Sequence, residues 1–328
     1  MKIYDSNEIK GRNAIDILNS YDDLSIFRKK GLDSSKSVFV STILHGCEPC
    51  GLNAVLRELE TEQQYEKDVY FMIGNVQAAR YEKPFTHRLL PDGQNFNRIW
   101  TENTKTNDER KALEVLKEIK KLNLDALIDL HSFTALTGSA HCYISGDNSI
   151  QLDFAQKIAP FIFKNGDDDG LLIDRTSSIC PSLLVECGTN GTKTADEFAY
   201  RALQKFFTNF NVIKNSDISL EKLTTNVYTG EQNFKFKTSD IEFGIKPIGT
   251  KIIIREDIES LNIVNIKAGD FFGYGDNLEF LTSKSAHPSY YFFISEGEVR
   301  FNKDCTINLF SKHPQRLVES GFYIYDRN

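Results

Sequence analysis

Long apolar runs, clustered cysteines and an export signal are all missing from this sequence. No apolar run approaches the roughly 20 residues that a membrane-spanning helix needs. The first residues, Met1 to Ser6, lead into charged residues rather than into the apolar core of a signal peptide. The six cysteines are spread over 328 residues and form no disulfide framework. We therefore expect a protein of the reducing cytoplasm with no membrane partner.

The motifs of several common enzyme classes are also missing. There is no glycine-rich dinucleotide fingerprint after a predicted strand, no P-loop and no Gly-x-Ser-x-Gly motif. Dinucleotide, nucleoside-triphosphate and serine-hydrolase chemistry are therefore excluded from our predictions. The net charge of −7 argues against nucleic acid as the main partner. It does not exclude an anionic substrate, because a local group of arginines can bind one in an acidic protein.

What the sequence contains indicates two domains, as its 328 residues allow. In residues 1–215, buried strands alternate with amphipathic helices; the strands are predicted at 38–44, 69–73, 124–130 and 183–185. This alternation predicts an α/β domain with a mixed, mostly parallel sheet flanked by helices. After that point, short apolar segments lie between Gly, Asp and Asn turns, so we expect residues 216–328 to form a smaller β-rich C-terminal domain.

Histidine and glutamate side chains follow directly after three of the predicted strands. His45 and Glu48 follow the first, His131 follows the third and Glu186 the fourth. Since the carboxyl ends of parallel strands meet at one edge of a sheet, these side chains should lie close together. Imidazole and carboxylate are zinc ligands, and a catalytic site uses three of them. We therefore predict one Zn²⁺ per chain, bound by His45, Glu48 and His131.

Other interpretations of these residues remain open. A His-x-x-Glu pair also occurs by chance, and Asp129 either orients a histidine or caps a turn. The overlapping Cys47 and Cys50 allow a redox pair or half of a zinc–cysteine site, but no second Cys-x-x-Cys completes it. We interpret the cysteines as structural. We interpret the remaining histidines as surface or packing residues: His87, His141, His287 and His313.

Glu186 and several arginines suit the chemistry of such a site. A carboxylate near the metal can take a proton from water and pass it to a leaving amine, although Glu186 could also be a surface residue that begins a helix. Guanidinium groups bind carboxylates in a bidentate manner and stay charged. Arginines in loops at the same predicted edge therefore indicate a small anionic substrate: Arg80, Arg88, Arg98 and Arg175.

At these residues the sequence resembles the succinylglutamate desuccinylase/aspartoacylase family, the deacylases of the zinc carboxypeptidase-like fold. The resemblance covers roughly residues 38–210 and, more loosely, the C-terminal region. The segments that carry it are His45-Gly-Cys-Glu48, Gly74-Asn75, Asn97-Arg98-Ile-Trp100, Asp129-Leu-His131, and Glu186 with Gly188. It implies that the His–Glu–His set binds zinc and that Glu186 is the general base and acid.

The resemblance also implies how the substrate is held. The residues that would bind its carboxylates are Asn97, Arg98 and Arg175. An arginine upstream of them would polarise the scissile carbonyl; Arg88 is our choice and Arg80 the alternative. A tyrosine of the C-terminal domain, Tyr290 or Tyr291, would lie over the site.

This chain departs from the family pattern at three places. The loop between Gly74 and Asn97 is longer than in the compact members of the family. Asn95-Phe-Asn97 replaces the usual Asp-Leu-Asn, and Cys187-Gly-Thr-Asn190 replaces a Gly-Pro-type segment. The specificity of known aspartoacylases is therefore not carried over to this chain.

These features together predict a zinc-dependent hydrolase that cleaves the amide bond of an N-acyl amino acid or a similar small anionic amide. The alternatives are a zinc carboxypeptidase that acts on small peptides and a non-catalytic metal-binding protein on the same fold. The sequence leaves open the acyl group, the amine and assembly into a homo-oligomer.

Overall fold

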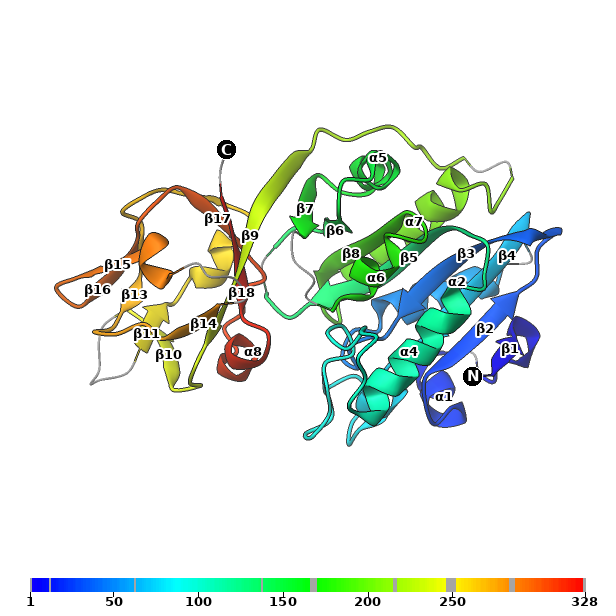
Figure 1. Ribbon diagram of the computed structural model, residues 1–328, viewed down its shortest axis with the longest axis horizontal. Helices are drawn as coiled ribbons and strands as arrows, with labels where there is room; N and C mark the ends of the chain where they lie inside the picture. The colour runs from blue at the N-terminus through cyan, green and yellow to red at the C-terminus, as the bar shows by residue number, and fades with distance from the viewer. Residues whose placement is uncertain are drawn as a thin grey trace. The chain divides into compact units, whose positions relative to one another are not determined.

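The chain divides into two compact units in the computed structural model (Figure 1). Each unit has a hydrophobic core of its own. The described residues are 2–11, 13–61, 63–136, 138–165, 170–214, 217–245, 252–282 and 287–326. The units are Met1–Phe133 with Ala140–Val227, and Thr134–Ser139 with Tyr228–Asn328. The predicted boundary between residues 215 and 216 lies outside the described residues, so the assignment of a catalytic domain to 1–215 and a C-terminal domain to 216–328 stays a prediction.

A mixed sheet forms the centre of the first unit, with the strand order β1-β2-β4-β3-β5-β8-β6-β7. The strands are β1 (Ile3–Asp5), β2 (Ser25–Lys29), β3 (Asp33–Thr42), β4 (Lys67–Ile73), β5 (Leu124–Phe133), β6 (His141–Ser145), β7 (Phe161–Asn165) and β8 (Ser182–Thr189). Neighbours pair antiparallel at β2–β4 and β8–β6 and parallel elsewhere in this order. The predicted mixed, mostly parallel sheet is thereby confirmed.

Helices flank this sheet. They are α1 (Ala14–Ser20), α2 (Cys50–Leu59), α3 (Val76–Arg80), α4 (Asn107–Ile119), α5 (Ser149–Ile158), α6 (Leu172–Thr176) and α7 (Lys193–Asn209). Apolar residues of α2, α5 and α7, such as Val55, Phe154 and Phe206, pack in one core with Val40 and Val185 of the sheet. None of the described residues of α6 belongs to that core, although α6 contacts β5, β6 and β8. We infer that α6 lies on the opposite face of the sheet.

The N-terminal segment also packs against this sheet. Apolar residues of α1 and β2, such as Ile17 and Phe27, share a buried cluster with Ile43 and Ile73. The long polar loop predicted after β4 also contains a helix, α3. Asn75 caps that helix, because its side-chain oxygen accepts a hydrogen bond from the backbone N–H of Ala78.

The second unit is built from two sheets. The first has the order β9-β18-β17-β12 with β14 beside β9, and the second has the order β10-β11-β13-β16-β15. The strands are β9 (Asn226–Phe236), β10 (Ile241–Gly244), β11 (Ile252–Arg255), β12 (Asn265–Ile266), β13 (Phe271–Tyr274), β14 (Phe280–Thr282), β15 (Phe292–Ser295), β16 (Glu298–Phe301), β17 (Cys305–Asn308) and β18 (Phe322–Asp326). The predicted β-rich C-terminal region is confirmed; it also contains the helix α8 (Pro314–Glu319).

Phenylalanine fills the core of the second unit. Phe234 and Phe322 belong to one sheet, Phe272 and Phe301 to the other, and all four lie in one buried cluster. Their rings pack at several tilts; for example, the centroids of Phe272 and Phe301 are 5.4 Å apart with an interplanar angle of 88°. The core of the second unit is therefore rich in aromatic rings.

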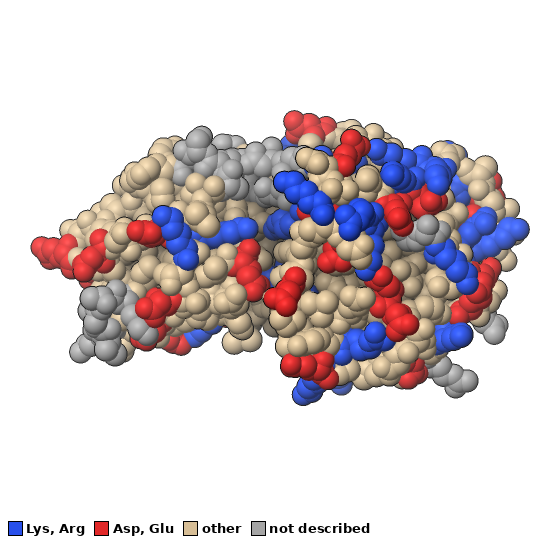
Figure 2. All heavy atoms as spheres, turned by 60° about the horizontal axis from the view of Figure 1, so that its bottom comes forward, with Lys and Arg blue, Asp and Glu red and all other residues tan. Residues whose placement is uncertain are grey.

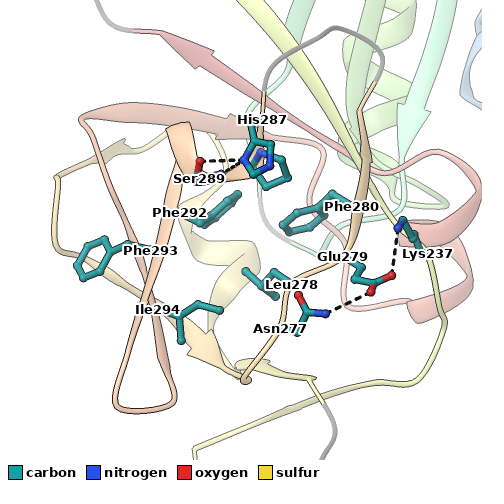
Figure 3. A pocket seen from close by; sticks show the side chains of 11 residues that line it. Lys237, Asn277, Leu278, Glu279, Phe280, His287, Ser289, Phe292, Phe293 and Ile294 are labelled. Carbon is teal, nitrogen blue, oxygen red and sulfur yellow. Dashed lines mark hydrogen bonds and ion pairs between the residues drawn. The ribbon is translucent and has the colours of Figure 1, made fainter.

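A pocket of about 630 Å³ opens in the second unit beside β14 and β15 (Figure 3). Its apolar wall consists of Leu278, Phe280, Phe292, Phe293 and Ile294. Its polar groups are paired with one another, as the dashed lines from Glu279 to Lys237 and to Asn277 show. None of the residues that the sequence predicts for the site lines this pocket.

The turn that follows β3 is tightly packed. Ile43 has a φ of 55°, a region that β-branched residues rarely adopt. The N–H of Gly46 donates a hydrogen bond of 2.9 Å to the carbonyl of Arg88. A Cβ atom on Gly46 would lie 2.4 Å from the nitrogen of Ala79 and 2.6 Å from the carbonyl oxygen of His87. Only glycine lets the turn approach α3 and the loop so closely.

Replacing Gly46 by alanine should therefore destabilise the protein. We expect the Gly46→Ala variant to lose about 1–3 kcal/mol of unfolding free energy, since the added methyl group meets backbone atoms. Urea unfolding followed by circular dichroism measures the loss. Gly275→Ala is the matched control, because the nearest atom to a Cβ there is 3.7 Å away. Equal losses in the two variants would contradict this prediction.

Candidate metal centre

Three buried side chains meet at the end of β3 and within β5. They are His45, Glu48 and His131, and one ligand atom from each lies within 4.8 Å of the others. Their exposed fractions are 3%, 2% and 1%. This is the set that the sequence predicts to bind a metal ion. Burial of such a cluster destabilises the folded protein unless its charged groups are paired with one another or coordinate a cation.

The carboxylate of Glu48 lies between the two imidazole rings. Its Oε1 is 2.9 Å from Nδ1 of His45, and its Oε2 is 2.8 Å from Nδ1 of His131. Within the described part of the chain, Nδ1 of His45 is buried and makes no hydrogen bond of good geometry, despite this short distance. A ring nitrogen and a carboxylate oxygen that face each other in this way fit two ligands of one cation.

The outer nitrogens of both rings are held by side-chain oxygens. Nε2 of His45 donates to Oδ1 of Asn95 at 2.9 Å, and Nε2 of His131 donates to Oδ2 of Asp129 at 3.0 Å. Such partners fix the orientation of an imidazole and direct its Nδ1 toward a metal. Asp129 therefore orients a histidine, which is one of the two roles that its position in the sequence allowed.

The contact from Asn95 was not predicted. Its only sequence signal is a carboxamide two residues before Asn97, at a position where the family pattern has aspartate. The loop brings it to His45 from 50 residues away. No local sequence pattern predicts a contact between residues so far apart in the chain.

The pKa values of the two histidines shift in opposite directions. Burial, aided by the charge of Arg88, holds the pKa of His45 well below its usual range. Burial lowers the pKa of His131 as well, but the carboxylates of Asp129 and Glu48 outweigh it and raise that pKa well above its usual range. Burial raises the pKa of Glu48, yet the two histidines outweigh it and hold that pKa well below its usual range. Glu48 is therefore the ionised centre of the cluster.

The two candidate arginines of the loop, Arg88 and Arg80, make different contacts, and only one of them is shown against the cluster. Nη1 of Arg88 donates to Oε1 of Glu48 at 2.6 Å, so its guanidinium group lies against the cluster. Arg80 instead bonds the Leu18 carbonyl and the side chain of Asp22. The hydrogen bond from the Gly46 N–H to the Arg88 carbonyl holds this part of the loop in place.

The three residues predicted to bind substrate belong to one hydrogen-bonded segment. Nδ2 of Asn97 lies 3.4 Å from Nε2 of His131, and its Oδ1 accepts a hydrogen bond from the first N–H of α6. Nη1 of Arg98 donates to the Asn97 carbonyl at 2.6 Å. Nε of Arg175 donates to the Trp100 carbonyl at 2.6 Å. Asn97 thus reaches the cluster directly, and the two arginines are fixed beside the same segment.

Glu186 lies next to His131 in the sheet. The two residues are register partners in the parallel pair β5–β8, and partners in register point to the same face. Glu186 is 8% exposed. Both strands continue past these residues, to Phe133 and Thr189, so the two side chains lie inside the strands rather than after them.

Two tyrosines and two cysteines remain of the residues that the sequence analysis singled out for the site. In the second unit, the hydroxyl of Tyr291 donates to Asp326 at 2.8 Å, while Tyr290 is 55% exposed. A role for either tyrosine at the cluster stays a prediction. Cys47 and Cys50 are buried and are not joined in a disulfide.

The surface carries charges of both signs. Figure 2 shows lysine and arginine interspersed with aspartate and glutamate over the face that it draws. In the part of the chain that the structure describes, no helix is long and apolar enough to span a membrane.

Comparison with known proteins now identifies the family. The succinylglutamate desuccinylase/aspartoacylase catalytic domain matches residues 34–209, more than half of the chain. A search of curated proteins finds no matching sequence.

Solved structures share the fold. The chain is similar to a succinylglutamate desuccinylase/aspartoacylase from Rhodobacter sphaeroides, with a TM-score of 0.59, 14% identity and coverage of 93% of this chain and 89% of that one. It is similar to the product-bound ectoine utilization protein EutE (DoeB) from Ruegeria pomeroyi, with a TM-score of 0.56, 15% identity and coverage of 87% and 82%. A succinylglutamate desuccinylase from Vibrio cholerae gives a TM-score of 0.56, 12% identity and coverage of 90% and 82%. The chain belongs to the succinylglutamate desuccinylase/aspartoacylase family.

Proposed function

We propose that this chain is a zinc-dependent amide hydrolase that removes the acyl group from an N-acyl amino acid or a similar small anionic amide. The observation that carries the proposal is the buried cluster of His45, Glu48 and His131, with Glu186 beside His131 in the sheet. Membership of a deacylase family supports the same reaction.

The donor set fits zinc. Two imidazoles and one carboxylate leave a fourth position open for water or substrate, as in catalytic zinc sites. The hydrogen bonds from Asn95 and Asp129 orient the rings of His45 and His131 for this purpose. Zinc bound there would lower the pKa of water to about 7 and polarise a carbonyl group.

Glu186 would move the proton in this reaction. Its carboxylate takes a proton from the attacking water, whose oxygen forms the new bond to the carbonyl carbon. When the carbon–nitrogen bond breaks, Glu186 gives that proton to the nitrogen, which leaves as the amine. The acyl group leaves as a carboxylic acid, whose proton passes to the amine, so that the products are a carboxylate and an ammonium ion. Burial beside His131 keeps the side chain of Glu186 in this position.

Arginine and asparagine side chains would bind the substrate. Arg88, whose guanidinium group lies against Glu48, would stabilise negative charge that develops on the carbonyl oxygen. Asn97, Arg98 and Arg175 would bind the carboxylates, since a guanidinium group matches carboxylate geometry. These contacts would favour a substrate that carries a carboxylate.

The first experiment tests whether the protein binds zinc. Protein purified without added zinc should contain about one equivalent by elemental analysis, as expected for a single catalytic site. Removal of the metal with a chelator should lower the melting temperature, because a ligand that binds only the folded state stabilises it. The Cys47→Ser and Cys50→Ser variants are controls and should keep the metal. Metal-free protein whose stability does not respond to chelation would contradict the zinc assignment.

Two experiments test the proposed reaction: a panel of substrates and the Glu186→Gln variant. We expect the protein to hydrolyse members of a panel of N-acetyl, N-succinyl and N-formyl amino acids. Glu186→Gln should keep the metal and lower kcat by about 10²- to 10⁴-fold, the usual contribution of a general base. Glu197→Gln is the matched control, because Glu197 pairs with Arg57 at the surface. A Glu186→Gln variant with full activity would refute the assigned role, and turnover of small peptides alone would favour a carboxypeptidase.

A further inference from the structure

A row of three polar residues crosses the sheet at Glu186. His131 of β5 is its register partner on one side, and His141 of β6 is its partner on the other. Side chains of residues directly opposite each other share one face, with Cβ atoms about 4.5–5.5 Å apart in antiparallel pairs. Glu186 therefore lies between two histidines.

The contacts of His131 already occupy both of its ring nitrogens. Nδ1 lies 2.8 Å from Glu48, and Nε2 lies 3.0 Å from Asp129. The same two nitrogens would serve the metal and Asp129 in a zinc site. Of the two histidines that flank Glu186, His141 is thus the one whose ring can donate to its carboxylate.

The surroundings of His141 fix the plane of its ring. The ring of Phe133 stacks on it with centroids 5.7 Å apart and an interplanar angle of 22°. Tyr143 and Phe163 pack edge-on at 5.4 and 5.2 Å. His141 is only 1% exposed. A buried imidazole needs a hydrogen-bond partner, and its neighbour in register is a carboxylate.

We infer that His141 is a positioning residue for Glu186: its ring N–H donates to the Glu186 carboxylate and holds it on the face of β8 that carries His131. This inference rests on the proposed role of Glu186. We predicted only a surface or packing role for His141 from the sequence, because its pairing with Glu186 depends on the antiparallel register of β6 with β8. A base that transfers a proton must keep its carboxylate within reach of the reacting atoms.

Two substitutions of His141 separate positioning from packing. His141→Phe keeps an aromatic ring within the cluster but has no N–H, whereas His141→Gln keeps an N–H donor. We expect His141→Phe to lower kcat by about 10- to 100-fold, as loss of an orienting partner does. Its KM and zinc content should not change, and His141→Gln should regain much of the rate. Phe163→Leu is the control from the same cluster and should lower stability without lowering kcat.

A double-variant cycle asks whether His141 acts through Glu186. In the Glu186→Gln background, His141→Phe should cause no further loss of rate, because residues that act as a unit are not additive. An unchanged kcat in His141→Phe, or the same loss in both backgrounds, would overturn the inference.

NMR spectra of the ring N–H groups, recorded on protein whose histidines carry a nitrogen isotope label, test the contact without any substrate. The signals of His141 are those that His141→Phe lacks. We expect its hydrogen-bonded ring proton to resonate far downfield in the wild type and to move upfield in Glu186→Gln. A His141 signal that is the same in both proteins would overturn the inference. If the wild type hydrolyses no member of the substrate panel, the proposed function fails while this measurement still decides whether the contact exists.

Discussion

The site depends on the position of one buried carboxylate. Glu48 lies between the Nδ1 atoms of two histidines, and it also accepts hydrogen bonds from Arg88 and from the backbone N–H of Ser132. A carboxylate that is 2% exposed stays ionised only when such partners compensate for the loss of water. Through these contacts Glu48 joins the turn after β3, the loop that carries Arg88 and the end of β5.

The sheet supplies the geometry around this carboxylate. Because β3, β5 and β8 are adjacent and parallel, the turn that carries His45, the side chain of His131 and that of Glu186 come to one edge. The outer contacts from Asn95 and Asp129 then set the direction of each imidazole. The same order of strands places β6 antiparallel beside β8, which brings His141 to the other side of Glu186.

Much of this could be predicted from the sequence, because the signals are local. Apolar runs mark the central strands, and His45, His131 and Glu186 come directly after these runs in the sequence. The family and the fold class are confirmed.

Features that depend on distant contacts could not be predicted. The structure brings Arg88 rather than Arg80 to Glu48, and this follows from the approach of Gly46 to the loop. The contact between Asn95 and His45 and the register of His141 with Glu186 likewise join residues that are far apart in the chain. A single sequence contains no pattern for such pairings.

X-ray absorption at the zinc edge of the purified protein tests the metal centre most directly. We expect a first shell of nitrogen and oxygen atoms at about 2.0–2.2 Å, with the multiple scattering of two imidazoles. The shell should contain no sulfur, since Cys47 and Cys50 are not among the ligands of this site. A sulfur shell at about 2.3 Å, or a spectrum with a single imidazole, would contradict a site formed by His45, Glu48 and His131.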